Sequence, residues 1–114
     1  MRFKSRSDVA LYVWDYFYIS HVPHEGDEGA WAAVERATHR IRQSEQYLDA
    51  PTPMDVRVRH ARRVRNSVRA ARRQIEQLSV RPDRWVIDRL DDLEAMADAV
   101  IKELGHDASR CGLN

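Results

Sequence analysis

Apolar residues recur at steps of three and four through most of this sequence, which is the spacing of one face of an α-helix. Three segments show the pattern without a break, at residues 28–49, 54–79 and 83–104. The stripe positions are Ala30, Val34, Ala37, Ile41, Ser44 and Leu48, then Ala61, Val64, Val68, Ala71, Ile75 and Leu78, then Val86, Leu90, Leu93, Ala97, Val100 and Leu104. Each segment is therefore predicted to be an amphipathic helix with one buried face.

Prolines and one glycine mark the ends of these predicted helices. Pro51 and Pro53 stop the first helix, because proline lacks the backbone N–H that a continuing helix needs. Pro53 also suits the first turn of the next helix, and Pro82 opens the third. Gly105 is expected to cap the C-terminal end of the third helix.

Residues 8–20 follow a different pattern, since they are apolar almost all round. The length of the run favours a helix, while its content of β-branched and aromatic residues leaves a strand as the alternative. Five aromatic residues crowd this segment: Tyr12, Trp14, Tyr16, Phe17 and Tyr18. Most are expected in the core rather than stacked on nucleic-acid bases. One helical core cannot cover them all, so self-association or docking to other protein subunits is expected.

The predicted fold is all-α, a compact antiparallel bundle of about four helices. One domain is expected over residues 1–105, with a flexible C-terminal tail at 106–114, because a chain of 114 residues rarely divides into two cores. Cys111 is the single cysteine, which excludes a disulfide framework and a cysteine-rich zinc site within the chain. The apolar run at 9–19 is too short to cross a bilayer, and no targeting segment is evident. A cytoplasmic protein without a membrane partner is expected.

Charge is distributed unevenly, although the net charge is only +1. Residues 54–78 contain eight arginines and two carboxylates, a balance of +6, whereas residues 83–104 carry a balance of −4. On a helical wheel, five of these arginines lie opposite the apolar stripe and two flank it. The first group is Arg59, Arg62, Arg63, Arg69 and Arg73, and the second is Arg65 and Arg72.

Three partners suit this arginine surface: nucleic-acid phosphates, acidic protein, or water with some internal ion pairs. If the two charged helices pack stripe to stripe, both charged faces turn outward, and so do Asp88, Asp91, Asp92 and Asp98 of the acidic helix. Only arginines such as Arg63, Arg65 or Arg72 then reach Glu94 or Glu103. Guanidinium grips phosphate with two hydrogen bonds, so sequence-independent contacts to a nucleic-acid backbone are favoured. The candidate nucleic-acid-binding residues are Arg59, Arg62, Arg63, Arg65, Arg69, Arg72 and Arg73, with Arg36 and Arg40 able to widen the patch.

Other chemistry is sparse. His21, His24, Glu25, Asp27 and Glu28 share one loop that has the composition of a divalent-ion site, but without a specified spacing it is interpreted as a surface loop. The sequence has no glycine-rich phosphate loop and no nucleophile elbow. It also lacks the Arg-x4-6-His spacing of small helical ribonuclease toxins. A non-enzymatic protein is expected, without cofactor, metal or small-molecule substrate.

Size, helix count and the exposed arginines, Arg62, Arg65, Arg69 and Arg73 among them, resemble the small helical subunits of multisubunit CRISPR effector complexes. That resemblance implies a non-catalytic subunit of a ribonucleoprotein that supports a guide–target duplex or a displaced strand through a basic helical face. The alternative is a protein–protein interaction module, an adaptor or phage-type inhibitor, that works through its acidic or aromatic surface.

Overall fold

The computed structural model describes residue 17, residues 23–48 and residues 51–110. These residues form three helices and no strand: α2 at Glu28–Glu45, α3 at Met54–Ile75 and α4 at Arg84–Arg110. The all-α prediction is confirmed. The described part of the chain holds three helices where about four were predicted, and the segment predicted at residues 8–20 lies outside it except for Phe17.

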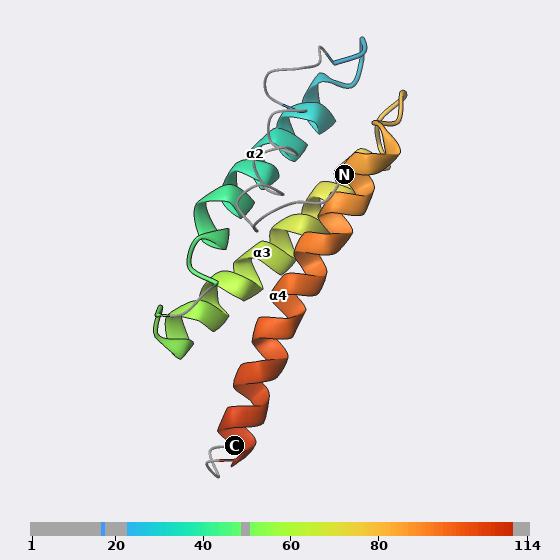
Figure 1. The fold of residues 1–114 in the computed structure, drawn as a ribbon. Helices are drawn as coiled ribbons and strands as arrows, with labels where there is room; N and C mark the ends of the chain where they lie inside the picture. The colour runs from blue at the N-terminus through green and yellow to red at the C-terminus, as the bar shows by residue number, and fades with distance from the viewer. Residues whose placement is uncertain (1–16, 18–22, 49–50, 111–114) are drawn as a thin grey trace.

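Helix α3 lies in the middle and packs against α2 on one side and α4 on the other (Figure 1). Both neighbours run antiparallel to it. On the α2 side, Arg40 meets Ser67 and Gln43 meets Arg63, so positions rise on one helix as they fall on the other. Helix α4 extends further than the other two at its C-terminal end (Figure 1). The predicted antiparallel bundle is thus confirmed for these three helices.

The predicted apolar stripes form the core. All six stripe positions of the second predicted helix are buried, and Leu90, Leu93 and Ala97 of the third are fully enclosed. Ala30 is the exception, since it is only half-buried. The stripes did not include Trp31 and Val58, which are also buried.

Trp31 connects α2 to the segment that precedes it. Its indole Nε1 donates a hydrogen bond of 2.8 Å to the backbone oxygen of Phe17. The two rings pack edge to face with centroids 4.9 Å apart, and Phe17 is 1% exposed. Burial of the indole therefore leaves its N–H satisfied, as a buried tryptophan requires.

Two helices end about four residues earlier than predicted. Helix α2 stops at Glu45 rather than 49, and α3 stops at Ile75 rather than 79. In both, tighter i→i+3 hydrogen bonds follow, from Leu48 N to Glu45 O at 3.1 Å and from Leu78 N to Ile75 O at 3.1 Å. The tightened turn brings each leucine back into the core, where both are buried. The stripe was predicted correctly, but its last residue belongs to the turn.

Helix α4 differs in the opposite direction. It continues to Arg110, so the predicted stop at Gly105 and the predicted tail at 106–110 were wrong. A glycine ends a helix by adopting a left-handed conformation, and Gly105 keeps the helical one. Glycine inside a helix costs about 1 kcal/mol relative to alanine, which a long, well-anchored helix tolerates.

Asp27 ties the start of α2 to the connection between α3 and α4. It occupies the N-cap position of α2, yet its carboxylate makes no capping hydrogen bond. Instead the carboxylate accepts hydrogen bonds from Ser79 N at 2.9 Å and from Ser79 Oγ at 2.8 Å. Asp27 is buried, and the backbone hydrogen bond from Ser79 lowers its pKa below the ordinary value of 3.8. The ionised carboxylate is therefore the form that the fold stabilises.

We expect Asp27→Asn to lower the melting temperature at neutral pH. We also expect the variant to lose less stability than wild type when the pH is lowered. Because the pKa of Asp27 is lower in the folded chain than in the unfolded chain, its contribution is complete at neutral pH and disappears as the pH falls through the folded pKa. Urea unfolding at about pH 7 and about pH 3 measures this difference. Glu25→Gln, in the same loop but exposed, is the control. Equal effects of the two substitutions would contradict the role given to Asp27.

Candidate functional site

The arginines of α3 divide into two groups because α3 has a helix on either side. At about 100° per residue, Arg65, Arg69 and Arg72 lie within about 60° of one another, on the flank that faces α4. Arg59 and Arg63 lie on the opposite flank, toward α2. The seven predicted site residues therefore do not form one surface.

The flank toward α4 forms a series of ion pairs. Arg69 Nε lies 2.9 Å from Glu94 Oε2, Arg72 Nε lies 3.2 Å from Asp91 Oδ1, and Arg65 Nη1 lies 4.0 Å from Asp98 Oδ1. Arg72 also contacts Glu94. Arg57, which was not among the predicted site residues, continues the series 3.3 Å from Glu103. We call these contacts the α3–α4 ion-pair series: Arg57, Arg65, Arg69 and Arg72 with Asp91, Glu94, Asp98 and Glu103.

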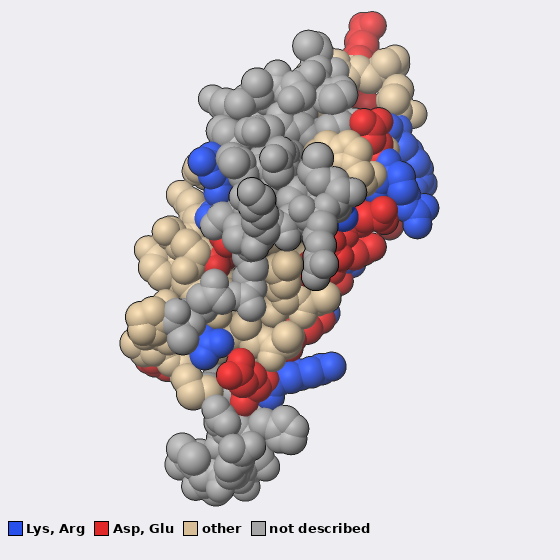
Figure 2. Space-filling model, in the orientation of Figure 1, with Lys and Arg blue, Asp and Glu red and all other residues tan. Residues whose placement is uncertain are grey.

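This series corrects three expectations. Arg69 was predicted to point outward, away from the acidic helix, and it pairs with Glu94 instead. Asp91 and Asp98 were also predicted to face outward, and both meet arginines of α3. The prediction assumed that α3 and α4 face each other directly, whereas α3 also packs against α2. In Figure 2, basic and acidic side chains lie next to one another along the edge of the molecule on which α4 lies.

Glu94 is the most enclosed carboxylate of the series, with 19% of its side chain exposed. The hydrogen bond from Arg72 lowers the pKa of Glu94, and Arg69 adds to the effect, while burial opposes it. Two guanidinium groups around one half-buried carboxylate keep it ionised. This flank of α3 is therefore neutralised within the protein.

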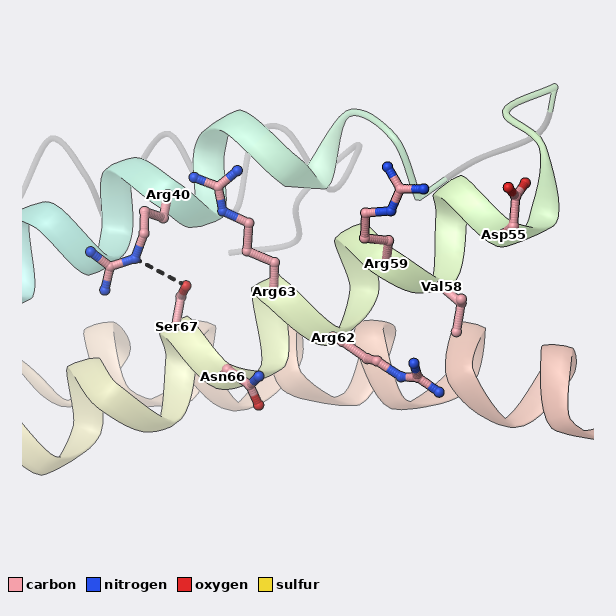
Figure 3. A pocket seen from close by; sticks show the side chains of 8 residues that line it. All are labelled: Arg40, Asp55, Val58, Arg59, Arg62, Arg63, Asn66 and Ser67. Atoms are coloured by element: carbon pink, nitrogen blue, oxygen red, sulfur yellow. Dashed lines mark hydrogen bonds between the residues drawn. The ribbon is translucent and has the colours of Figure 1, made fainter.

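A hollow of about 610 Å³ lies on the outward face of α3 and reaches Arg40 of α2 across the α2–α3 seam. Four arginines line it: Arg40 from α2 and Arg59, Arg62 and Arg63 from α3 (Figure 3). We call this feature the cationic hollow. Its other lining residues are Asp55, Val58, Asn66 and Ser67. Asp55 is the single carboxylate among the eight lining residues, so the hollow carries an excess of positive charge.

Neutral groups hold two of these arginines. Arg40 Nε donates a hydrogen bond of 3.4 Å to Ser67 Oγ, which Figure 3 marks. Arg63 Nη2 donates one of 3.5 Å to Gln43 Oε1. Arg59 and Arg62 form no ion pair with any residue that the structure describes, although Asp55 lies one turn before Arg59. The charge of the hollow is therefore left for solvent or a ligand.

Like charges repel within the cationic hollow. Arg59 stands three and four residues before Arg62 and Arg63, a spacing that costs about 0.2–0.5 kcal/mol per pair on an isolated helix. The positive charges of these arginines also act on His60. Burial lowers the pKa of His60, and the charges of Arg63 and Arg59 lower it further. An anion bound in the hollow would relieve this repulsion.

The remaining predicted groups lie elsewhere. Arg73 is exposed on α3, outside the hollow and outside the ion-pair series. In the histidine-containing loop, Asp27 turns inward to Ser79, and no three ligand-type side chains of the described residues come together to hold a metal ion. Asn66 and Ser67 also line the cationic hollow and were not predicted from the sequence. Their place one turn beyond Arg62 and Arg63 was the available signal.

Over the described residues, the fold is an all-α arrangement of three helices, and the hollow gives it a face with an excess of positive charge. None of the helices, over the residues described, is long and apolar enough to cross a membrane. Comparison with protein-family models, with curated proteins and with solved structures gives no significant match.

We expect Glu94→Gln to lower the free energy of unfolding by about 1–2 kcal/mol, because it removes the charge that two arginines share. The low folded pKa of Glu94 also predicts the pH dependence: its contribution is present at neutral pH and is lost as the pH falls through that pKa. Wild type should thus lose more stability than Glu94→Gln between about pH 7 and about pH 3. Urea denaturation measures both effects.

Asp92→Asn is the matched control for Glu94→Gln. Asp92 pairs with Arg89 within α4 at 3.4 Å and is more exposed than Glu94. We expect this substitution to change the free energy of unfolding by about 0–0.5 kcal/mol. If both substitutions prove equally small, the α3–α4 ion-pair series does not stabilise the packing of the two helices.

Proposed function

We propose that this chain is a non-enzymatic nucleic-acid-binding protein whose cationic hollow contacts the sugar–phosphate backbone. The observation that carries the proposal is that Arg40, Arg59, Arg62 and Arg63 line one hollow with a single carboxylate among the lining residues. Guanidinium groups bind phosphate oxygens with paired hydrogen bonds, and backbone contacts need no base-reading residues. Asn66 and Ser67 add neutral hydrogen-bonding groups at the same place.

The proposed site is smaller than the seven arginines singled out from the sequence. Arg65, Arg69 and Arg72 already have carboxylate partners on α4, so a phosphate would have to compete for them. Arg73 contributes only to the general field. Arg40 joins the site because α2 packs beside α3, which brings it to the hollow.

We also propose that the chain is a subunit of a ribonucleoprotein assembly in the cytoplasm. This proposal rests on the resemblance to the small subunits of CRISPR effector complexes. A hollow with four arginines offers few contacts, so the isolated chain should bind weakly and gain affinity from neighbouring subunits. The alternative was an adaptor or phage-type inhibitor working through an acidic or aromatic surface. Its acidic version loses support because Asp91, Glu94, Asp98 and Glu103 are engaged by α3, whereas the aromatic segment at residues 8–20 lies outside the described residues except for Phe17.

Binding to labelled oligonucleotides at several salt concentrations tests the proposal. With three or four phosphates contacted, the logarithm of the association constant should fall with the logarithm of salt concentration, at a slope of about −2 to −3 for a single strand and about −3 to −4 for a duplex. Arg59 and Arg62 form no ion pair with a carboxylate among the described residues, so both are free to contact phosphate. The double variant Arg59→Glu with Arg62→Glu should therefore abolish measurable binding.

Arg81→Glu with Lys102→Glu is the control, because both residues are exposed and lie outside the hollow. Each double variant takes the formal net charge from +1 to −3, two reversals of two charges each. The control should retain most of the affinity. If both double variants lose binding equally, overall charge is responsible and the hollow is not the site.

A further inference from the structure

An exposed aromatic ring lies on the α2–α3 seam, along which Arg40 and Arg63 of the cationic hollow are also held. Tyr47, in the turn after α2, is 40% exposed, and among the described residues only Val80 is a comparably exposed large apolar side chain. One face of its ring stacks on His60, with centroids 4.3 Å apart and planes at 25°.

The antiparallel register places this ring next to the arginines. Along the α2–α3 seam, Arg40 meets Ser67, Gln43 meets Arg63, and Tyr47 meets His60. The ring therefore lies one helical turn, about 6 Å, beyond the contact that holds Arg63. On α3, His60 lies between Arg59 and Arg63 in the sequence, and both charges act on its imidazole.

His60 is itself held in position. Its Nδ1 lies 3.1 Å from Ser44 Oγ, and its ring is partly buried against Tyr47. A ring supported from behind by a second, oriented ring loses little conformational freedom when a flat ligand stacks on it. The seam thus offers phosphate-binding cations and a stacking surface in one line.

Resting on the proposed function, we infer that the ligand is a single-stranded nucleic acid, with phosphates in the cationic hollow and an unpaired base stacked on Tyr47. Proteins that bind single strands without sequence preference combine a basic groove with aromatic side chains. A duplex keeps its bases stacked inside, so it can use the arginines but not Tyr47. The ring, rather than the charge, is the feature that distinguishes the two forms.

Fluorescence anisotropy with three probes of equal length tests this inference: oligothymidine, an abasic strand with the same phosphates, and a duplex. Wild type should bind oligothymidine about fivefold or more tightly than the abasic strand, which is the effect of one stacked base. Tyr47→Ala should remove that difference and leave the affinity for the abasic strand and the duplex unchanged. Tyr47→Phe should retain it, and Val80→Ala, at the other exposed apolar residue, should have no effect.

The outcomes separate the inference from the proposed function. If wild type binds oligothymidine and the abasic strand equally, or prefers the duplex, the single-strand inference is overturned. Should Tyr47→Ala bind like wild type while Arg59→Glu with Arg62→Glu abolishes binding, the backbone site stands and the stacking site does not. Failure of wild type to bind any probe at low salt, or an arginine variant that binds normally, overturns the proposed function and the inference with it.

Discussion

The structure depends on one constraint: the apolar face of α3 is shared between two helices. Val64, Val68 and Ala71 lie at its centre and are fully buried. Because α2 covers one edge of that face and α4 the other, each flank of α3 meets a different neighbour. The identity of each neighbour then decides the environment of the arginines on that flank. Apolar packing, which has no preference for charge, thus determines the electrostatics of the surface.

The two flanks show what this sharing does. Toward α4, the repulsion between Arg65 and Arg69 and between Arg69 and Arg72 is offset by carboxylates on the facing helix. Toward α2, Arg63 meets the neutral Gln43, and Arg59 and Arg62 form no ion pair with any described residue, so the repulsion among these three arginines is not offset. The asymmetry is a property of the packed molecule, and it leaves an excess of positive charge at the cationic hollow.

Periodicity was sufficient to predict the core, because a stripe such as Val86, Leu90 and Leu93 has one way to be buried in a helix. It predicted helix ends less well, since Leu48 and Leu78 continue the stripe after the helix has tightened into a turn. Periodicity could not predict contacts between residues that are distant in the sequence. Nothing local to Asp27 indicates that it binds Ser79, which lies 52 residues further along the chain.

The candidate site shows the same division between local and long-range information. That Arg59, Arg62 and Arg63 lie opposite the stripe follows from their positions on one helix. That Arg69 pairs with Glu94 depends on how α4 is rotated against α3, which a single helical wheel does not contain. Arg40 was noted only as an addition to the patch. Its place in the hollow, like the stacking of Tyr47 on His60, depends on the register between α2 and α3.

Under the proposed function, the register would also let the seam bind a ligand without breaking the contacts between the helices. Arg40 and Arg63 are held by hydroxyl and amide oxygens, which position a guanidinium but leave its charge uncompensated. A phosphate that approaches them therefore gains attraction without first breaking an ion pair, as it would have to do at Arg69 or Arg72. Partial restraint also reduces the side-chain entropy lost on binding. Arginines with charged partners on α4 hold the helices together, whereas those with neutral partners on the α2 side are the ones that the proposed function would use for binding.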